Sequence, residues 1–259
     1  MNTQFQIDER VIQRAMEPYP KIPEIVPFST PVVSFGDPNE ASMVTVGINP
    51  SSLEFFKGSK VKKLLAPGEK RLVDTETLGI ELGTTLNRDQ AIRVIVGCYN
   101  YFKTKPYDWF DHLEENANKV FGYSYKNGSS AHLDLVQWAT DPVWGNFEDE
   151  ITQEILLKND LEFLKYQIAL KKYEIVFLNG AKVHKHLTDH GLLEAATVEG
   201  VPYRTKNGDP RILKIYQGKT PKGSLVLGWN RPFPGHYISK EEFPRVMREV
   251  HNFFRKITR

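Results

Sequence analysis

The stretch VTVGINPSS, Val44–Ser52, places a short apolar strand directly before Gly-Ile-Asn-Pro. Val and Thr favour a strand buried in a parallel sheet. Gly47 frees the backbone at the strand end, and Pro50 restricts Asn49 to extended conformations. Open α/β sheets bind ligands at the carboxyl ends of their strands, so Asn49 is a candidate site residue. The same sequence is also typical of a capped turn leading into a helix, with Asn49 or Ser51 as the cap.

Apolar runs and helical patterns alternate along the rest of the chain, which predicts an α/β fold of three layers, α/β/α, around a mostly parallel sheet. The expected strands cover residues 43–46, 132–138, 173–180, 211–218 and 223–230. The expected helices cover residues 8–17, 87–102, 106–122, 149–172, 181–191 and 239–256. Asn87 is the expected cap of the second helix, and Ser239 with Glu242 forms the expected capping box of the last. Residues 53–86 have little periodicity and predict an elaborated loop, the usual place for a substrate surface.

Several of the predicted strands end in polar turns. These turns are Asn49-Pro50, residues 139–142, Asn179-Gly180 and residues 229–232. Parallel strands share one carboxyl edge, so we expect these turns to converge although they are far apart in sequence.

The composition is ordinary for a globular protein, with 40% hydrophobic and 25% charged residues among 259. We expect a single domain, residues 1–259, that begins with a helix and a Pro-rich arm within residues 1–40. Cys98 is the one cysteine, which excludes an internal disulfide and favours the cytoplasm and a buried, inert thiol. No apolar run has the length of a membrane span, and we expect no membrane partner and a monomer.

The net charge of +2 conceals an uneven distribution. From Val201 onward there are thirteen Lys or Arg and four Asp or Glu, so the last part of the chain is basic. A basic region can bind a phosphate backbone by counterion release, or it can simply solvate a helix and a hairpin.

Four segments together resemble the uracil-DNA glycosylase superfamily. VGINP resembles the first motif of its mismatch-specific branch, and IVFLNGAKV resembles that branch's third strand. LDLVQWATDP is similar to the strand-two segment that contacts the flipped base, and LVLGWNRPFPGH stands where the second motif occurs. The chain departs from the family at Ser51, where Gly is usual, and at Asn230-Arg231-Pro232, where His-Pro-Ser or Asn-Pro-Ser is common. It has no cysteine cluster, which excludes the iron-sulfur branches.

The resemblance implies a uracil-DNA-glycosylase-like fold and hydrolysis of the N-glycosidic bond of uracil or another deaminated base in DNA, without a cofactor or a metal. It implies three groups of site residues. The catalytic group is Asn49, Asn230 and His236; the base-binding group is Ile48, Pro50, Phe55, Phe56, Asp134 and Asn179; the DNA-binding group is Arg231, Phe233 and Lys240.

In this scheme Asn49 orients a water molecule, and Asn230 or His236 donates a hydrogen bond to the base oxygen. Phe55 or Phe56 stacks on the base, and Phe233 enters the minor groove as an apolar wedge.

Each of these residues also has a structural interpretation. His236 suits a surface loop, Phe55, Phe56 and Phe233 suit packing against their own domain, and Asp134 suits an ion pair. Asn179 suits a strand end that caps the next helix. His184, His186 and His190 cannot all reach one ion from a regular helix, which favours surface histidines.

Two further functions stay open at this point. The departures at Ser51 and at residues 230–232 favour a binding module of the same fold that recognises nucleic acid or a protein and has no activity. An α/β enzyme for a free nucleotide is the third interpretation, although the chain has no Gly-rich phosphate loop.

Overall fold

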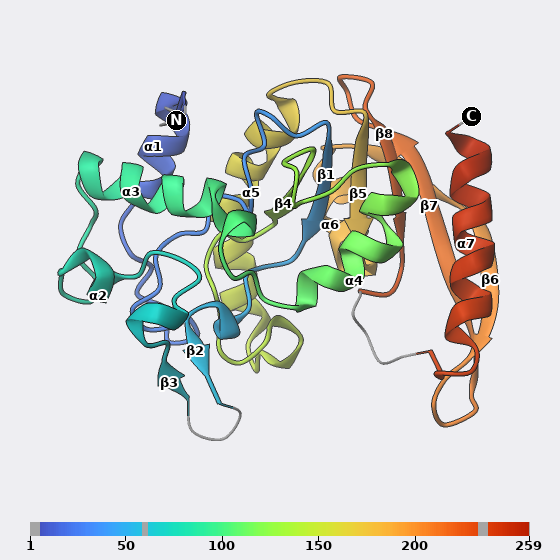
Figure 1. Cartoon of the computed structure of the whole chain (residues 1–259), viewed down its shortest axis with the longest axis horizontal. Coiled ribbons are helices and arrows are strands. Elements are labelled where there is room, and N and C mark those ends of the chain that lie inside the picture. Colours follow the sequence, from blue (N-terminus) through green and yellow to red (C-terminus); the bar gives the residue numbers. More distant parts are fainter. Residues whose placement is uncertain (1–5, 59–61, 233–237, 259) are drawn as a thin grey trace. The chain divides into compact units, whose positions relative to one another are not determined.

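The computed structural model describes residues 6–58, 62–232 and 238–258. The protein divides into two compact units, each assembled from three separate segments. Unit 1 consists of residues 1–37, 48–107 and 133–164, and unit 2 consists of residues 38–47, 108–132 and 165–259. The colours of Figure 1 follow the sequence from the blue N-terminal helix to the red C-terminal helix.

The regular elements alternate much as the sequence predicts (Figure 1). The helices are α1 Glu9–Ala15, α2 Thr75–Leu78, α3 Arg88–Tyr99, α4 Trp109–Asn116, α5 Glu150–Ala169, α6 Ala181–Asp189 and α7 Phe243–Ile257. The strands are β1 Met43–Gly47, β2 Phe56–Lys57, β3 Lys63–Leu64, β4 Ser130–Asp134, β5 Ile175–Asn179, β6 Glu194–Arg204, β7 Pro210–Lys219 and β8 Leu225–Trp229. None of the described helices combines the length and the apolar character needed to cross a bilayer.

A six-stranded sheet in the order β4-β1-β5-β8-β7-β6 confirms the predicted α/β class with a mostly parallel sheet. β1, β5 and β8 run parallel, with Met43 opposite Ile175 and Ile175 opposite Leu225. Every residue of β1 and β5 is buried, as continuous apolar runs in a parallel sheet predict. The carboxyl ends of β1, β5 and β8 therefore lie at one edge of this sheet.

One side of the sheet ends in an antiparallel ribbon. β7 pairs antiparallel with both β8 and β6. β6 is not among the strands that the sequence predicts, because most of its residues are exposed and only Val201 and Tyr203 alternate as buried positions.

Aromatic rings fix α7 on one face of this sheet. The Phe177 ring lies 4.7 Å from Trp229 and 5.7 Å from Phe254, measured between centroids. The predicted helix start at Ser239 is wrong, because α7 begins at Phe243 and Glu242 occupies the cap position. Ser239 Oγ only accepts a hydrogen bond from Glu242 N, at 3.3 Å, in the turn before the helix.

Two other predicted boundaries differ from the structure. The helix expected at 106–122 is split into α4 and a 3-10 helix that ends before Gly122, which has the left-handed φ of 84°. The strand expected at 132–138 ends at Asp134, because the Gln137 side chain bonds back to the Asp134 carbonyl and turns the chain.

Two local predictions agree with the structure. Asn87 caps α3, and its side chain accepts a hydrogen bond from Gln90 N. Cys98 is buried, and burial raises the pKa of its thiol to about 11, which suits an inert side chain.

A buried ion pair and one amide organise unit 1. Arg14 Nη2 lies 2.7 Å from Asp160 Oδ1, and both side chains are almost fully buried. Arg14 Nε also donates to Gln137 Oε1, and Asp160 Oδ2 accepts from the Gln137 backbone N–H. Burial raises the pKa of Asp160, and the nearby Arg14 cation opposes that shift. The network joins α1, α5 and the segment that follows β4.

The Pro-rich arm that follows α1 has no helix, as its prolines predict, and pairs with the same segment of unit 1. Val32 N donates to the Gln137 carbonyl and Val26 N donates to the Ala139 carbonyl. Ile25 forms an antiparallel bridge with Thr140. The arm thereby holds the loop at Thr140 in place.

Replacing Arg14 by Met should lower the free energy of unfolding by about 3–5 kcal/mol, because the Asp160 carboxylate loses its buried partner. Urea unfolding followed by circular dichroism measures this change. Arg14→Met combined with Asp160→Leu should recover much of the loss. The matched control is Arg88→Met, which breaks the exposed pair with Glu9 and should cost less than about 1 kcal/mol. Equal losses for the Arg14 and Arg88 variants would contradict the assigned role of the network.

Candidate functional site

The strand-end turn at Asn49 converges with the loop that follows β4, as the sequence predicts. Asn49 Nδ2 donates to Thr140 Oγ1 and to the Pro50 carbonyl, both at 2.9 Å. Ser51 forms a parallel bridge with Thr140, and Ile48 accepts a hydrogen bond from Val136 N. Two turns about ninety positions apart in the chain therefore form one small structure in unit 1.

The amide of Asn49 has a defined orientation. The Pro50 carbonyl can only accept a hydrogen bond, so the atom that faces it must be the nitrogen. Among the described residues no group donates to Asn49 Oδ1. The half-buried side chain is thus held by its nitrogen, and its oxygen is left as an acceptor.

The sequence also predicts a capped turn that leads into a helix, and this prediction is correct with Ser51 as the cap. Ser51 Oγ accepts from Leu53 N and caps the 3-10 helix Ser52–Glu54. Pro50 is buried beneath the turn. The cap fixes the chain directly after Asn49.

The 3-10 helix carries a buried carboxyl group that the sequence pattern does not reveal as a site residue. Glu54 is 2% exposed, and its Oε2 accepts a hydrogen bond of 2.7 Å from Tyr101 Oη. Burial raises the pKa of Glu54 to about 8, and the negative charge of Asp134 adds to this rise, whereas Tyr101 and Arg71 oppose it. Glu54 is therefore largely neutral at pH 7. In the sequence, only its position between Leu53 and Phe55 indicates that this carboxyl group is buried.

Arg71 and Tyr101 complete this cluster. Arg71 Nη1 donates to the Leu53 carbonyl at 2.9 Å, and the guanidinium carbon lies 5.5 Å from the centre of the Tyr107 ring. Tyr107 N donates to Tyr101 Oη. Burial first, and then the charge of Glu54, raises the pKa of Tyr101, so its hydroxyl stays protonated and donates to Glu54.

Lys62 provides a cation next to the Asn49 turn. Lys62 Nζ forms an ion pair with Asp141 and lies 3.3 Å from Ser52 Oγ. Asp141 directly follows Thr140, the residue that anchors Asn49. Lys62 therefore contacts the residues next in sequence to the Asn49 anchor and to the Ser51 cap.

The residues predicted to contact a base differ in their exposure. Phe55 is 2% exposed and packs in the core, Phe56 is half-buried, and Asp134 is 5% exposed. Of the two phenylalanines, only Phe56 has surface to offer a ligand.

The loop over residues 53–86 borders a cavity of about 740 Å³ in unit 1. Leu72, Val73 and the α3 residues Ile92 and Val96 form part of an apolar wall. The described lining does not include Asn49, so the cavity is a separate feature from the strand-end turn.

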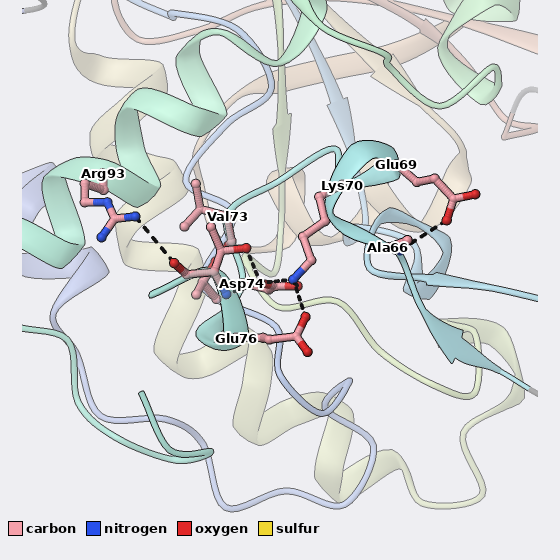
Figure 2. Close-up of polar contacts among 9 residues, drawn as sticks. Ala66, Glu69, Lys70, Val73, Asp74, Glu76 and Arg93 are labelled. Atoms are coloured by element: carbon pink, nitrogen blue, oxygen red, sulfur yellow. Dashed lines mark hydrogen bonds and ion pairs between the residues drawn. The ribbon is translucent and has the colours of Figure 1, made fainter. Parts of the chain in front are cut away.

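Charged side chains lie along the border of this cavity. Figure 2 shows how Lys70 reaches Asp74 and Glu76. Arg93 points toward the neighbouring loop, where its Nη2 lies 3.4 Å from the Thr77 carbonyl. These contacts tie the loop to itself and to α3, which gives the cavity a defined rim.

The other two strand-end turns converge in unit 2. Gly180 N donates to the Trp229 carbonyl and Ala181 N donates to the Asn230 carbonyl. Asn179 is 2% exposed, and its Oδ1 accepts a hydrogen bond of 2.8 Å from Trp229 Nε1. The cap position of α6 belongs to Gly180 and not to Asn179.

Asn230 contacts the neighbouring strand. Its Oδ1 accepts from Lys214 N at 2.9 Å, and its Nδ2 lies 3.5 Å from the Ile212 carbonyl. The side chain thus continues the β7–β8 pairing by one residue. Arg231 is half-buried and Lys240 is exposed, whereas Phe233 and His236 lie outside the described residues.

The histidines of α6 do not form a metal site. His184 Nε2 lies 2.9 Å from the Ala195 carbonyl, and its ring stacks on Tyr216 at 3.9 Å. Within residues 6–58, 62–232 and 238–258, no group of His, Cys, Asp or Glu is arranged to hold a metal ion.

No protein-family model matches this chain, and no curated protein matches its sequence. The resemblance to uracil-DNA glycosylases thus rests on the quoted motifs, and the roles that it implies stay predictions. What the geometry adds is an anchored Asn49 in the same unit as a buried, neutral Glu54.

The raised pKa of Glu54 predicts a dependence of stability on pH. The folded state binds this proton more tightly than the unfolded state, whose pKa is near 4.5. The protonated Glu54 side chain therefore stabilises the folded state fully below about pH 4.5. This stabilisation is lost as the pH rises through about 8. The total loss in the free energy of unfolding is up to ~5 kcal/mol. Urea unfolding between pH 5 and pH 8.5 should show this fall in the wild type and a much flatter profile in Glu54→Gln.

The matched control for this measurement is Glu69→Gln. Glu69 is exposed, and hydrogen bonds from Lys57 and the Ala66 backbone lower its pKa, so it is ionised throughout this range. Its variant should keep the slope of the wild type. A wild-type slope in Glu54→Gln would show that Glu54 does not titrate in this window.

Proposed function

We propose that the chain is a DNA glycosylase-like hydrolase of the uracil-DNA-glycosylase-like fold, which removes uracil or another deaminated base by hydrolysis of the N-glycosidic bond. The observation that carries the proposal is the anchored amide of Asn49. Its nitrogen is held by Thr140 and Pro50, and its oxygen is available to accept a hydrogen bond from water.

The reaction would proceed on a base that has left the duplex stack, because its sugar carbon cannot be reached inside the helix. Positive charge develops on the sugar and negative charge on the departing base as the bond breaks. Asn49 would orient the attacking water through Oδ1. An amide is not a general base, so the enzyme would depend on stabilising the departing base more than on removing a proton from water.

The residue that stabilises the departing base is assigned by the resemblance to Asn230 or His236. A donor in this role is worth on the order of 3 kcal/mol in the transition state. Asn230 is engaged with β7 through both ends of its amide, so its Nδ2 would have to leave the Ile212 carbonyl to serve a base. This favours His236 over Asn230.

The engagement of Asn230 also supports a second candidate. A binding module of the same fold would need no donor for the departing base, and an Asn230 that only extends the β7–β8 pairing suits that function. Such a protein would bind DNA with strong salt dependence and would release no base.

The test is a gel assay on end-labelled oligonucleotides that carry uracil, hypoxanthine or xanthine, as single strands and opposite each base. Alkali cuts the strand at any abasic product. The proposal expects product from the wild type and a loss of about 10²–10³-fold in Asn49→Ala, comparable to removal of a key polar group in other active sites. Absence of product across the panel from a folded protein would overturn the proposal in favour of the binding module.

The anchor itself gives a separate prediction. Thr140→Val removes the hydroxyl that accepts from Asn49 Nδ2 and keeps the shape of the side chain. The amide keeps only its bond to Pro50, so the rate of base release should fall by roughly tenfold while substrate binding is unchanged. The control is Thr188→Val in α6, whose hydroxyl bonds the His184 carbonyl in unit 2. Equal rates for the Thr140 variant and the wild type would show that Asn49 needs no such anchor.

A further inference from the structure

The ribbon formed by β6 and β7 is longer than the strand beside it. The last paired residue of β8 is Trp229, which lies opposite Ile215 of β7. Residues 210–214 of β7 come before that point. Among the described strands they pair only with β6, apart from the contact with Asn230. Five residues of antiparallel strand span roughly 17 Å, and they extend past the carboxyl end of β8. Figure 1 shows this part of the orange ribbon running on beside α7.

The direction of this extension places it at the edge with the strand-end turns of unit 2. β5 and β8 are parallel and end together at Asn179 and Trp229. Asn230 then bonds Lys214 through both its backbone and its side chain. The projecting part of the ribbon therefore begins directly beside Asn230.

The projecting part is basic and exposed, and we call it the ribbon tip, residues 202–214. It carries four cations and one carboxylate: Arg204, Lys206, Arg211, Lys214 and Asp209. All five residues are exposed. Arg204 Nη1 donates to the Gly208 carbonyl, and Glu242 accepts from the Arg204 backbone N–H.

The other three cations have no counterion in the part of the chain that the structure describes. Lys206, Arg211 and Lys214 take part in none of the ion pairs between described residues, whereas Arg88 of α3 and Arg245 of α7 each pair with glutamate. Ile212, between Arg211 and Leu213, is 54% exposed. The tip thus combines positive charge without a counterion and a small apolar surface.

We propose that the ribbon tip is a docking surface for the phosphate backbone of duplex DNA. A two-stranded antiparallel ribbon has the dimensions that the major groove admits, and Lys and Arg on it can reach the phosphates on either side. Each neutralised phosphate releases counterions, which gives the contact its affinity. This inference rests on the DNA partner of the proposed function and adds the surface that holds the DNA.

Charge complementarity favours DNA over a protein partner for this surface. A protein interface usually has a core with few charges and with aromatic anchors. The ribbon tip has four cations and no exposed aromatic side chain among its described residues. α6 contacts the ribbon at Tyr216, where His184 stacks, and the cations of the tip beyond this contact are exposed to a ligand.

The test compares two double variants that each remove two positive charges. The tip variant is Arg211→Ala with Lys214→Ala. The control variant is Lys219→Ala with Lys222→Ala, whose exposed residues lie at the other end of β7 and in the turn after it. Binding of a fluorescein-labelled, undamaged 20-base-pair duplex is measured by anisotropy between 50 and 250 mM KCl. The slope of log affinity against log salt should fall by about 1.8 in the tip variant, from two lost phosphate contacts, and little in the control.

Thermal unfolding of both variants checks that the fold is retained. Arg211→Lys with Lys214→Arg keeps the charges and should keep the wild-type slope. Equal changes in the tip and control variants, or no salt-dependent binding by the wild type, would overturn the inference. Base release is measured separately on the uracil substrate. If the salt slope falls in the tip variant and the wild type releases no base, the docking surface is supported and the glycosylase activity is rejected. If the wild type releases base and the tip variant keeps the wild-type slope, the glycosylase activity is supported and the docking surface is rejected.

Discussion

The parallel pairing of β1, β5 and β8 is the constraint on which the arrangement of candidate residues depends. Because these strands run in one direction and are largely buried, each must leave the sheet at the same edge through a turn. The regular ladder ends in these turns, and side chains supply part of the hydrogen bonding that follows it. Asn49 Nδ2 donates to the Pro50 carbonyl, and Asn230 Oδ1 accepts from Lys214 N.

Those two asparagines show that the same residue type at a strand end can form different hydrogen bonds. Asn49 is held through its nitrogen, and no described group donates a hydrogen bond to its oxygen. Asn230 uses its oxygen, and more weakly its nitrogen, to prolong a strand pairing. A residue type after a strand therefore locates a candidate, and only its hydrogen-bond partners show which of its atoms remain available.

The sequence is sufficient to predict the elements whose pattern is local. The mostly apolar, fully buried runs of β1 and β5 and the Asn87 cap of α3 are examples. It is insufficient for β6, whose exposed residues hide a strand, and for the end of β4, which the Gln137 side chain sets from within the next turn. Glu54 escapes prediction for a related reason, because its burial and its hydrogen bond depend on residues such as Tyr101 that are distant in sequence.

The β6–β7 ribbon has a further property that follows from its pairing. Beyond Trp229 it pairs with no third strand among the described residues, apart from its contact with Asn230. Its side chains alternate between two faces with a period of two. Insertion of two residues in each strand would move the turn outward by about 7 Å and leave every existing side chain on its own face. The length of the β6–β7 ribbon can thus change by two residues per strand at a time during evolution, without a change in the core of the sheet.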